Sequence, residues 1–134
     1  MPSTSGLTHV AMSVPEGTLT DAYRSRLVDF YGRILGWREM ESLRLPDRLI
    51  VAVGPSSYIN IRERPDSMVT HGYEHFGVLV RSAENLQQLW ADLANEEDDV
   101  GLERLTTNDD GEGSFLFRYL LPMAVEAQFY ARLL

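Results

Sequence analysis

The stretch GYEHFGVLV (residues 72–80) decides the fold, because it combines an apolar run with a histidine near its start. An apolar run of this length, bounded by turn residues, predicts a buried β-strand. The chain repeats the pattern near its N-terminus, where LTHVAMSV (residues 7–14) places His9 in the same setting as His75. Two such strands in one short chain indicate an internal repeat.

The two histidines lie 66 residues apart, and the same offset aligns a second pair of segments. It places Asn60, within SYINIRE, on Glu126, within MAVEAQF. Two separate strand-like segments therefore share one register. We predict two copies of one unit, with module 1 at about residues 6–65 and module 2 at about residues 72–134.

The first copy reads as a strand, a helix and three further strands. The first strand is predicted at Leu7–Val14, and apolar residues then recur at helical spacing over residues 23–34. Thr18 with Asp21 predicts the helix start as a capping box, and Gly36 predicts its end. The three later strand candidates are WREMESLR (37–44), RLIVAVG (48–54) and SYINIRER (57–64).

The second copy has the same order. A strand at Tyr73–Val80 leads to Ser82 as a helix N-cap, followed by apolar residues at helical spacing over 86–93. Its later strands are predicted at VGLERL (100–105), SFLFRYLL (114–121) and AVEAQFY (124–130), with TTNDDGEG (106–113) as a loop. The predicted fold class is α+β: one domain, residues 1–134, of two tandem βαβββ modules whose curved mixed sheets enclose a cleft or partial barrel.

Composition narrows the classes of function. A net charge of −8 argues against nucleic acid or an anionic membrane surface as the partner, since both need basic patches. The chain has no cysteine, so thiolate catalysis and cysteine-bound metals are excluded. No apolar run is long enough to span a membrane. We expect a cytoplasmic protein in which any metal is bound by histidine, carboxylate, amide or water.

The alternation of side chains along each strand places four residues on the faces turned away from the helices: His9, Asn60, His75 and Glu126. If the two sheets curve toward each other, these four side chains converge. A carboxylate in the apolar last strand is costly to bury without a partner. That partner is either a metal ion or an arginine such as Arg118 or Arg62. A histidine that was useful for packing in the ancestral unit would also appear twice.

Four segments together resemble the vicinal oxygen chelate superfamily, which contains glyoxalases, bleomycin-resistance proteins and extradiol dioxygenases. They are THVAMSV (8–14), FYGRILGW (30–37), EHFGVLV (74–80) and VEAQFY (125–130). With the repeat, the resemblance covers nearly the whole chain. It implies one divalent metal ion, Fe, Mn, Co, Ni or Zn, bound by His9, His75 and Glu126.

The resemblance also implies roles for neighbouring residues. Asn60 occupies the place of a further carboxylate ligand in glyoxalases, so the ligand set is closest to the two-His-one-carboxylate set of the dioxygenases, and Asn60 is predicted to bind substrate. Glu126 and Tyr119 are the predicted catalytic residues, and Phe117 is a predicted wall of the substrate cavity. Ring cleavage normally uses a further histidine, and only His71 remains for that role.

Two functions stay open. The first is a metal-dependent dioxygenase, lyase or isomerase acting on a small substrate with vicinal oxygens. The second is a metal-free protein of the bleomycin-resistance kind, which sequesters a cationic drug or metabolite and would suit the acidic chain. A third possibility is a protein that keeps the fold without its ancestral activity and serves in an interaction. We expect a homodimer for either main function, with the site built within one chain or across two.

Overall fold

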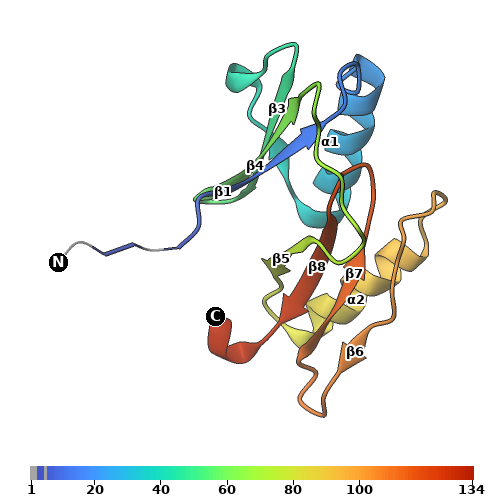
Figure 1. Cartoon of the computed structure of the whole chain (residues 1–134). Coiled ribbons are helices and arrows are strands. Elements are labelled where there is room, and N and C mark those ends of the chain that lie inside the picture. Colours follow the sequence, from blue (N-terminus) through green and yellow to red (C-terminus); the bar gives the residue numbers. More distant parts are fainter. Residues whose placement is uncertain (1–2, 5) are drawn as a thin grey trace. The chain divides into compact units, whose positions relative to one another are not determined.

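The computed structural model describes residues 3–4 and 6–134. The chain divides into two compact units, Met1–Val69 (unit 1) and Thr70–Leu134 (unit 2). Each unit has one long helix and one sheet (Figure 1). No helix among the described residues is long and apolar enough to cross a membrane.

Unit 1 is built from one mixed sheet and the helix α1. Its elements are β1 (His9–Val14), α1 (Asp21–Leu35), β2 (Arg38–Glu39), the 3-10 helix η1 (Glu41–Leu43), β3 (Arg48–Gly54) and β4 (Ser57–Glu63). The sheet order is β1-β4-β3-β2, with β1 parallel to β4 and the other pairs antiparallel. The α-helix is therefore the crossover that a parallel β1–β4 pair needs.

Unit 2 repeats this plan. Its elements are β5 (His75–Leu79), α2 (Ala83–Ala94), β6 (Thr106–Thr107), β7 (Gly113–Phe117), β8 (Ala124–Phe129) and the 3-10 helix η2 (Ala131–Leu133). The order β5-β8-β7-β6 matches that of unit 1, again with one parallel pair. Two open, four-stranded mixed sheets, each with a helix, confirm the predicted α+β class and the repeated βαβββ unit.

Alternation along the strands creates the core of each unit. In β4, Ile59 and Ile61 are completely buried, whereas Asn60 between them is half-buried on the opposite face. In β8, Val125 and Ala127 are completely buried on either side of the half-buried Glu126. Each sheet thus has one closely packed apolar face and one face that carries polar residues.

The residues that cap the two helices can be compared with the predicted ones. Gly36 ends α1 in the left-handed conformation, with φ of 74°, and the Ser82 side chain caps α2 by accepting from Asn85 N–H, as predicted. The predicted start of α1 at Thr18 is wrong. Thr20 is the N-cap and accepts from Tyr23 N–H at 3.1 Å, whereas the Thr18 hydroxyl donates to the Pro15 carbonyl at 2.6 Å.

The predicted strand at residues 37–44 is confirmed only over β2, and the one predicted at 100–105 is wrong; both differences have local reasons. Over residues 37–44 only β2 is extended, because the chain bends into η1 and Arg44 reaches back to Glu39 with N–O distances of 2.6 and 2.5 Å. This carboxylate raises the pKa of the Arg44 guanidinium. Over residues 100–105, Gly101 has a φ of 56° and interrupts the extended backbone, so the edge strand is instead β6, inside the predicted loop.

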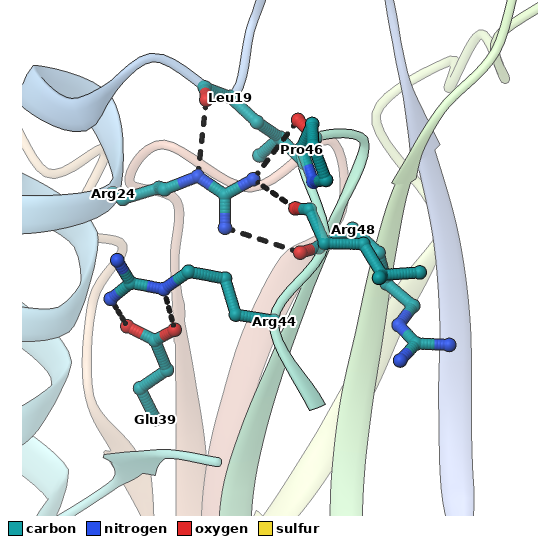
Figure 2. Close-up of polar contacts among 7 residues, drawn as sticks. Leu19, Arg24, Glu39, Arg44, Pro46 and Arg48 are labelled. Carbon is teal, nitrogen blue, oxygen red and sulfur yellow. Dashed lines mark hydrogen bonds and ion pairs between the residues drawn. The ribbon is translucent and has the colours of Figure 1, made fainter. Parts of the chain in front are cut away.

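Arg24 is a buried cation held by the main chain. It lies on α1 with 5% of its surface exposed, and its guanidinium donates to four carbonyl oxygens at 2.6–3.1 Å, those of Leu19, Leu45, Pro46 and Arg48 (Figure 2). Carbonyl groups can replace water around a buried guanidinium because it has five donors and no acceptor. Arg24 thereby ties the start of α1 to the turn that precedes β3.

The C-terminal turn of unit 2 is expected to loosen in acid. Glu112 accepts from the Ala131 N–H at 2.9 Å and from the Asn108 side chain, and these bonds hold the pKa of Glu112 below its usual value of 4.5. A lowered folded-state pKa stabilises the folded turn above pH 4.5, and this contribution is lost as the pH falls through that pKa. We expect the hydrogen-exchange protection factor of the Ala131 amide to fall between about pH 5 and pH 3.

The matched variant is Glu112→Ala. Its Ala131 protection factor should already be low at neutral pH and should not change further in acid. An acid-sensitive protection factor in this variant would show that another group controls the turn.

Candidate functional site

His75 and Glu126 lie together on the polar face of the unit 2 sheet. His75 begins β5, and Glu126 lies at the centre of β8, opposite Gly77 in the parallel register. The His75 Nε2 atom is 3.6 Å from Glu126 Oε1, and the two side chains are 26% and 22% exposed. The predicted approach of a histidine and a glutamate from two distant segments therefore occurs within unit 2.

The main chain sets the orientation of the His75 ring. His75 Nδ1 lies 2.6 Å from the carbonyl oxygen of Tyr73, and a carbonyl only accepts, so Nδ1 carries the proton. In the neutral ring Nε2 then presents a lone pair toward Glu126. A protein histidine that binds a metal usually has this arrangement, in which the second nitrogen donates to a carbonyl or carboxylate.

The spacing of the pair fits two ligands of one cation. At 3.6 Å the two atoms are too far apart for a good hydrogen bond. Nitrogen and oxygen ligands lie about 2.0–2.2 Å from an ion such as zinc, so two ligands of one ion are at most about 4.4 Å apart. The donor set, imidazole with carboxylate, suits a divalent first-row metal.

His9 and Asn60 share the polar face of the unit 1 sheet. His9 is exposed, stacks on Tyr58 with 4.8 Å between ring centroids, and has Nδ1 2.9 Å from the Thr8 hydroxyl. Asn60 is opposite Ala11 in the parallel register, and its Oδ1 atom is buried without a hydrogen-bond partner among the described residues. A buried acceptor that receives no donor is destabilising, so such a group in a native structure calls for a reason.

The remaining predicted site residues lie elsewhere. Phe117 is completely buried in the core of unit 2 and pairs with Val125, so it is on the face opposite to Glu126. The Tyr119 hydroxyl donates to the Asp98 carboxylate in a short hydrogen bond. Phe117 is therefore not on the sheet face of Glu126, and Tyr119 lies beyond the end of β7.

Arg118, one of the two arginines considered as a partner for Glu126, forms hydrogen bonds with other residues. The Arg118 guanidinium donates to the Thr70 hydroxyl at 3.3 Å and to the Pro122 carbonyl at 3.1 Å.

The third histidine, exposed His71, donates its main-chain N–H to the Glu74 carboxylate at 2.9 Å, and this bond lowers the pKa of Glu74. The described parts of the chain contain no group of three His, Asp or Glu residues arranged so that they could hold a metal ion.

One polar residue of unit 1 that lines a cavity was not predicted to do so from the sequence. Arg62 lies two positions after Asn60 on the same face of β4 and lines a cavity of about 390 Å³. The period-two spacing from Asn60 was the available signal, but Arg62 was considered only as a partner for Glu126.

No family profile matches the sequence, and no curated protein matches it. Solved structures with the same fold cover almost the whole chain. Lactoylglutathione lyase from Agrobacterium tumefaciens has a TM-score of 0.69 and 16% identity over 98% of both chains. A glyoxylase/bleomycin resistance protein/dioxygenase domain from Frankia sp. EAN1pec has a TM-score of 0.65 and 20% identity over 95% of this chain and 93% of that one.

A third similar structure was solved with bound groups. It is a variant of the fosfomycin resistance protein FosX from Listeria monocytogenes in complex with Mn(II) and 1S,2S-dihydroxypropylphosphonic acid. Its TM-score is 0.65 and its identity 16%, over 95% of this chain and 93% of that one. With two βαβββ units in matching order, these similarities show that the chain shares the fold of these proteins, which is the fold that the resemblance seen in the sequence implies.

Proposed function

We propose that this protein is a divalent-metal-dependent enzyme that acts on a small molecule with two adjacent oxygen atoms. One observation carries the proposal: His75 Nε2 and Glu126 Oε1 face each other at 3.6 Å, while Nδ1 of the same ring is held by the Tyr73 carbonyl. An imidazole and a carboxylate so placed can bind one divalent cation. Similar folds include a lyase and a FosX variant solved with Mn(II), which supports the same class.

The proposed metal ligands are His75 and Glu126 from unit 2 and His9 from unit 1. His9 comes from the same chain or from a second copy of it in a homodimer. When bound, the ion supplies Lewis-acid polarisation of the substrate oxygens. The protein's own contribution is orientation: Tyr73 O fixes which His75 nitrogen is free, and Asn60 Oδ1 accepts a hydrogen bond from a donor on the substrate.

The test of this proposal is the metal content of the intact chain. Protein purified without chelators or a histidine tag, then dialysed against Mn(II), Fe(II), Co(II), Ni(II) or Zn(II), is expected to retain about one ion per chain. Elemental analysis measures the ratio. Retention of none of these ions would contradict the proposal and leave a metal-free ligand-binding protein as the better explanation of the fold.

A further inference from the structure

The polar face of the unit 1 sheet contains a cavity of about 390 Å³. β1 and β4 line it, together with the segment that follows β4. Ser13 and Arg62 are opposite each other in the parallel register, and Asn60 precedes Arg62 by one position on this face. The cavity therefore brings a hydroxyl, a guanidinium and an amide to the sheet face that also carries His9.

Asn60 contributes a hydrogen-bond acceptor that is not used within the described part of the chain. Its Oδ1 atom is buried and receives no hydrogen bond within residues 3–4 and 6–134. The apolar neighbours of Asn60 along β4, Ile59 and Ile61, are completely buried on the other face, so packing does not require an amide here. A buried acceptor without a donor calls for a reason, and a ligand donor such as a hydroxyl would supply one.

Arg62 contributes a positive charge without a carboxylate partner. It is half-buried, and its side chain makes no hydrogen bond or ion pair with the described part of the chain. Across the antiparallel register it faces Arg48, whose guanidinium donates to the Leu43 carbonyl at 3.1 and 2.6 Å. Two like charges directly opposite each other destabilise a sheet, and Arg48 does not line the cavity, so of the two Arg62 is the guanidinium that can bind an anion there.

Ser13 contributes a hydroxyl proton. Its Oγ atom accepts from the Met68 N–H at 2.6 Å, which fixes the oxygen and leaves the O–H group to donate into the cavity. The acidic residue at the cavity, Asp66, is 80% exposed and pairs with Arg64 at 3.5 Å. Its negative charge is therefore paired with the exposed Arg64 at the rim of the cavity.

We propose that this cavity binds the oxyanion group of a small hydroxylated acid. Arg62 and the Ser13 hydroxyl donate to the oxyanion, and Asn60 Oδ1 accepts from a hydroxyl group of the same molecule. Carboxylates and phosphates share this chemistry, since both present oxygens that accept from a guanidinium and a hydroxyl. This inference rests on the proposed function, because it names the class of substrate that would bind beside His9 on the unit 1 sheet.

The test is an NMR titration of the isotope-labelled full chain with D-glycerate, glycerol 3-phosphate, inorganic phosphate and uncharged glycerol. The hydroxylated acids should shift the amides of β1 and β4 and bind more tightly than inorganic phosphate, and glycerol should cause no shift. Comparison of D-glycerate with glycerol 3-phosphate shows which acid group the site prefers. Binding of glycerol as strong as that of either acid would overturn the proposal.

Three variants identify the contacts. Arg62→Gln should weaken binding of both acids by about tenfold or more, because a charge-assisted hydrogen bond is lost. Arg64→Gln is the matched control at the same cavity and should change binding less than about threefold, since its side chain is 55% exposed and paired with Asp66. Asn60→Leu should remove the preference for hydroxylated acids over inorganic phosphate without lowering the melting temperature. Equal effects of the two arginine variants would overturn the proposal.

The titration is repeated with metal-free protein and with protein loaded with Zn(II), which is diamagnetic and leaves the amide signals visible. Metal retention without acid binding would overturn the cavity assignment and leave the metal proposal intact. Acid binding that depends on Arg62 in a protein that retains no metal would support the cavity and contradict the metal proposal.

Discussion

Replacing Arg24 by methionine is expected to lower the free energy of unfolding by about 3 kcal/mol. The guanidinium of this buried side chain donates to four main-chain carbonyl oxygens, and methionine replaces the unbranched apolar stem of arginine but offers no donor. The carbonyls of residues 19, 45, 46 and 48 would lose their shared partner, and water would have to reach them. Urea denaturation followed by fluorescence measures the change, because buried Trp37 lies in the same unit.

Arg33→Met is the matched control on the same helix. The Arg33 side chain is 51% exposed and pairs with Asp29 one turn away at 3.2 Å, a kind of surface pair that contributes less than about 1 kcal/mol. Similar losses in the two variants would show that the carbonyl cluster around Arg24 does not stabilise unit 1 more than an ordinary surface pair.

Replacing Glu126 by glutamine is expected to weaken metal binding by more than about 100-fold. Loss of a group that only orients a metal ligand already costs about 10–100-fold, and here the ligand itself is lost. His75→Ala should have an effect of the same size, because the imidazole and the carboxylate are 3.6 Å apart and are proposed to bind one ion. Competition with a metal-sensitive dye measures the affinity of each variant.

Glu84→Gln is the control for the loss of charge. Glu84 is an exposed carboxylate in the first turn of α2, so its removal should leave metal affinity within about threefold of the unchanged protein. A Glu126→Gln protein that binds metal as tightly as Glu84→Gln would remove Glu126 from the ligand set.

The approach of His75 to Glu126 could be predicted from the sequence because two simple periodicities determine it. The alternation of side chains in β5 and β8 puts both residues on one face, and the 66-residue offset indicates that the flanking strands belong to equivalent sheets. The same reasoning placed His9 and Asn60 on one face of unit 1. These predictions depend on strand direction and register, which the apolar pattern specifies strongly.

Three features could not be predicted from the apolar pattern: the cap of α1, the face of the sheet that Phe117 lies on, and the interruption at Gly101. Thr18 and Thr20 are both suitable helix caps by residue type, and the choice of Thr20 depends on which hydroxyl reaches a free N–H group. Phe117 alternates with Leu116 in β7, but only the register with β8 shows that the phenylalanine faces the core. Similarly, the left-handed backbone of Gly101 breaks a segment whose apolar pattern indicates a strand.

The central claim is that His9, His75 and Glu126 bind one cation. The most direct test is an anomalous difference map from crystals of the unchanged protein grown with Mn(II). The account predicts a strong peak bonded to Nε2 of His75, to the carboxylate of Glu126 and to His9 of the same chain or of a second copy. A map in which no manganese lies within bonding distance of both His75 and Glu126 would contradict it.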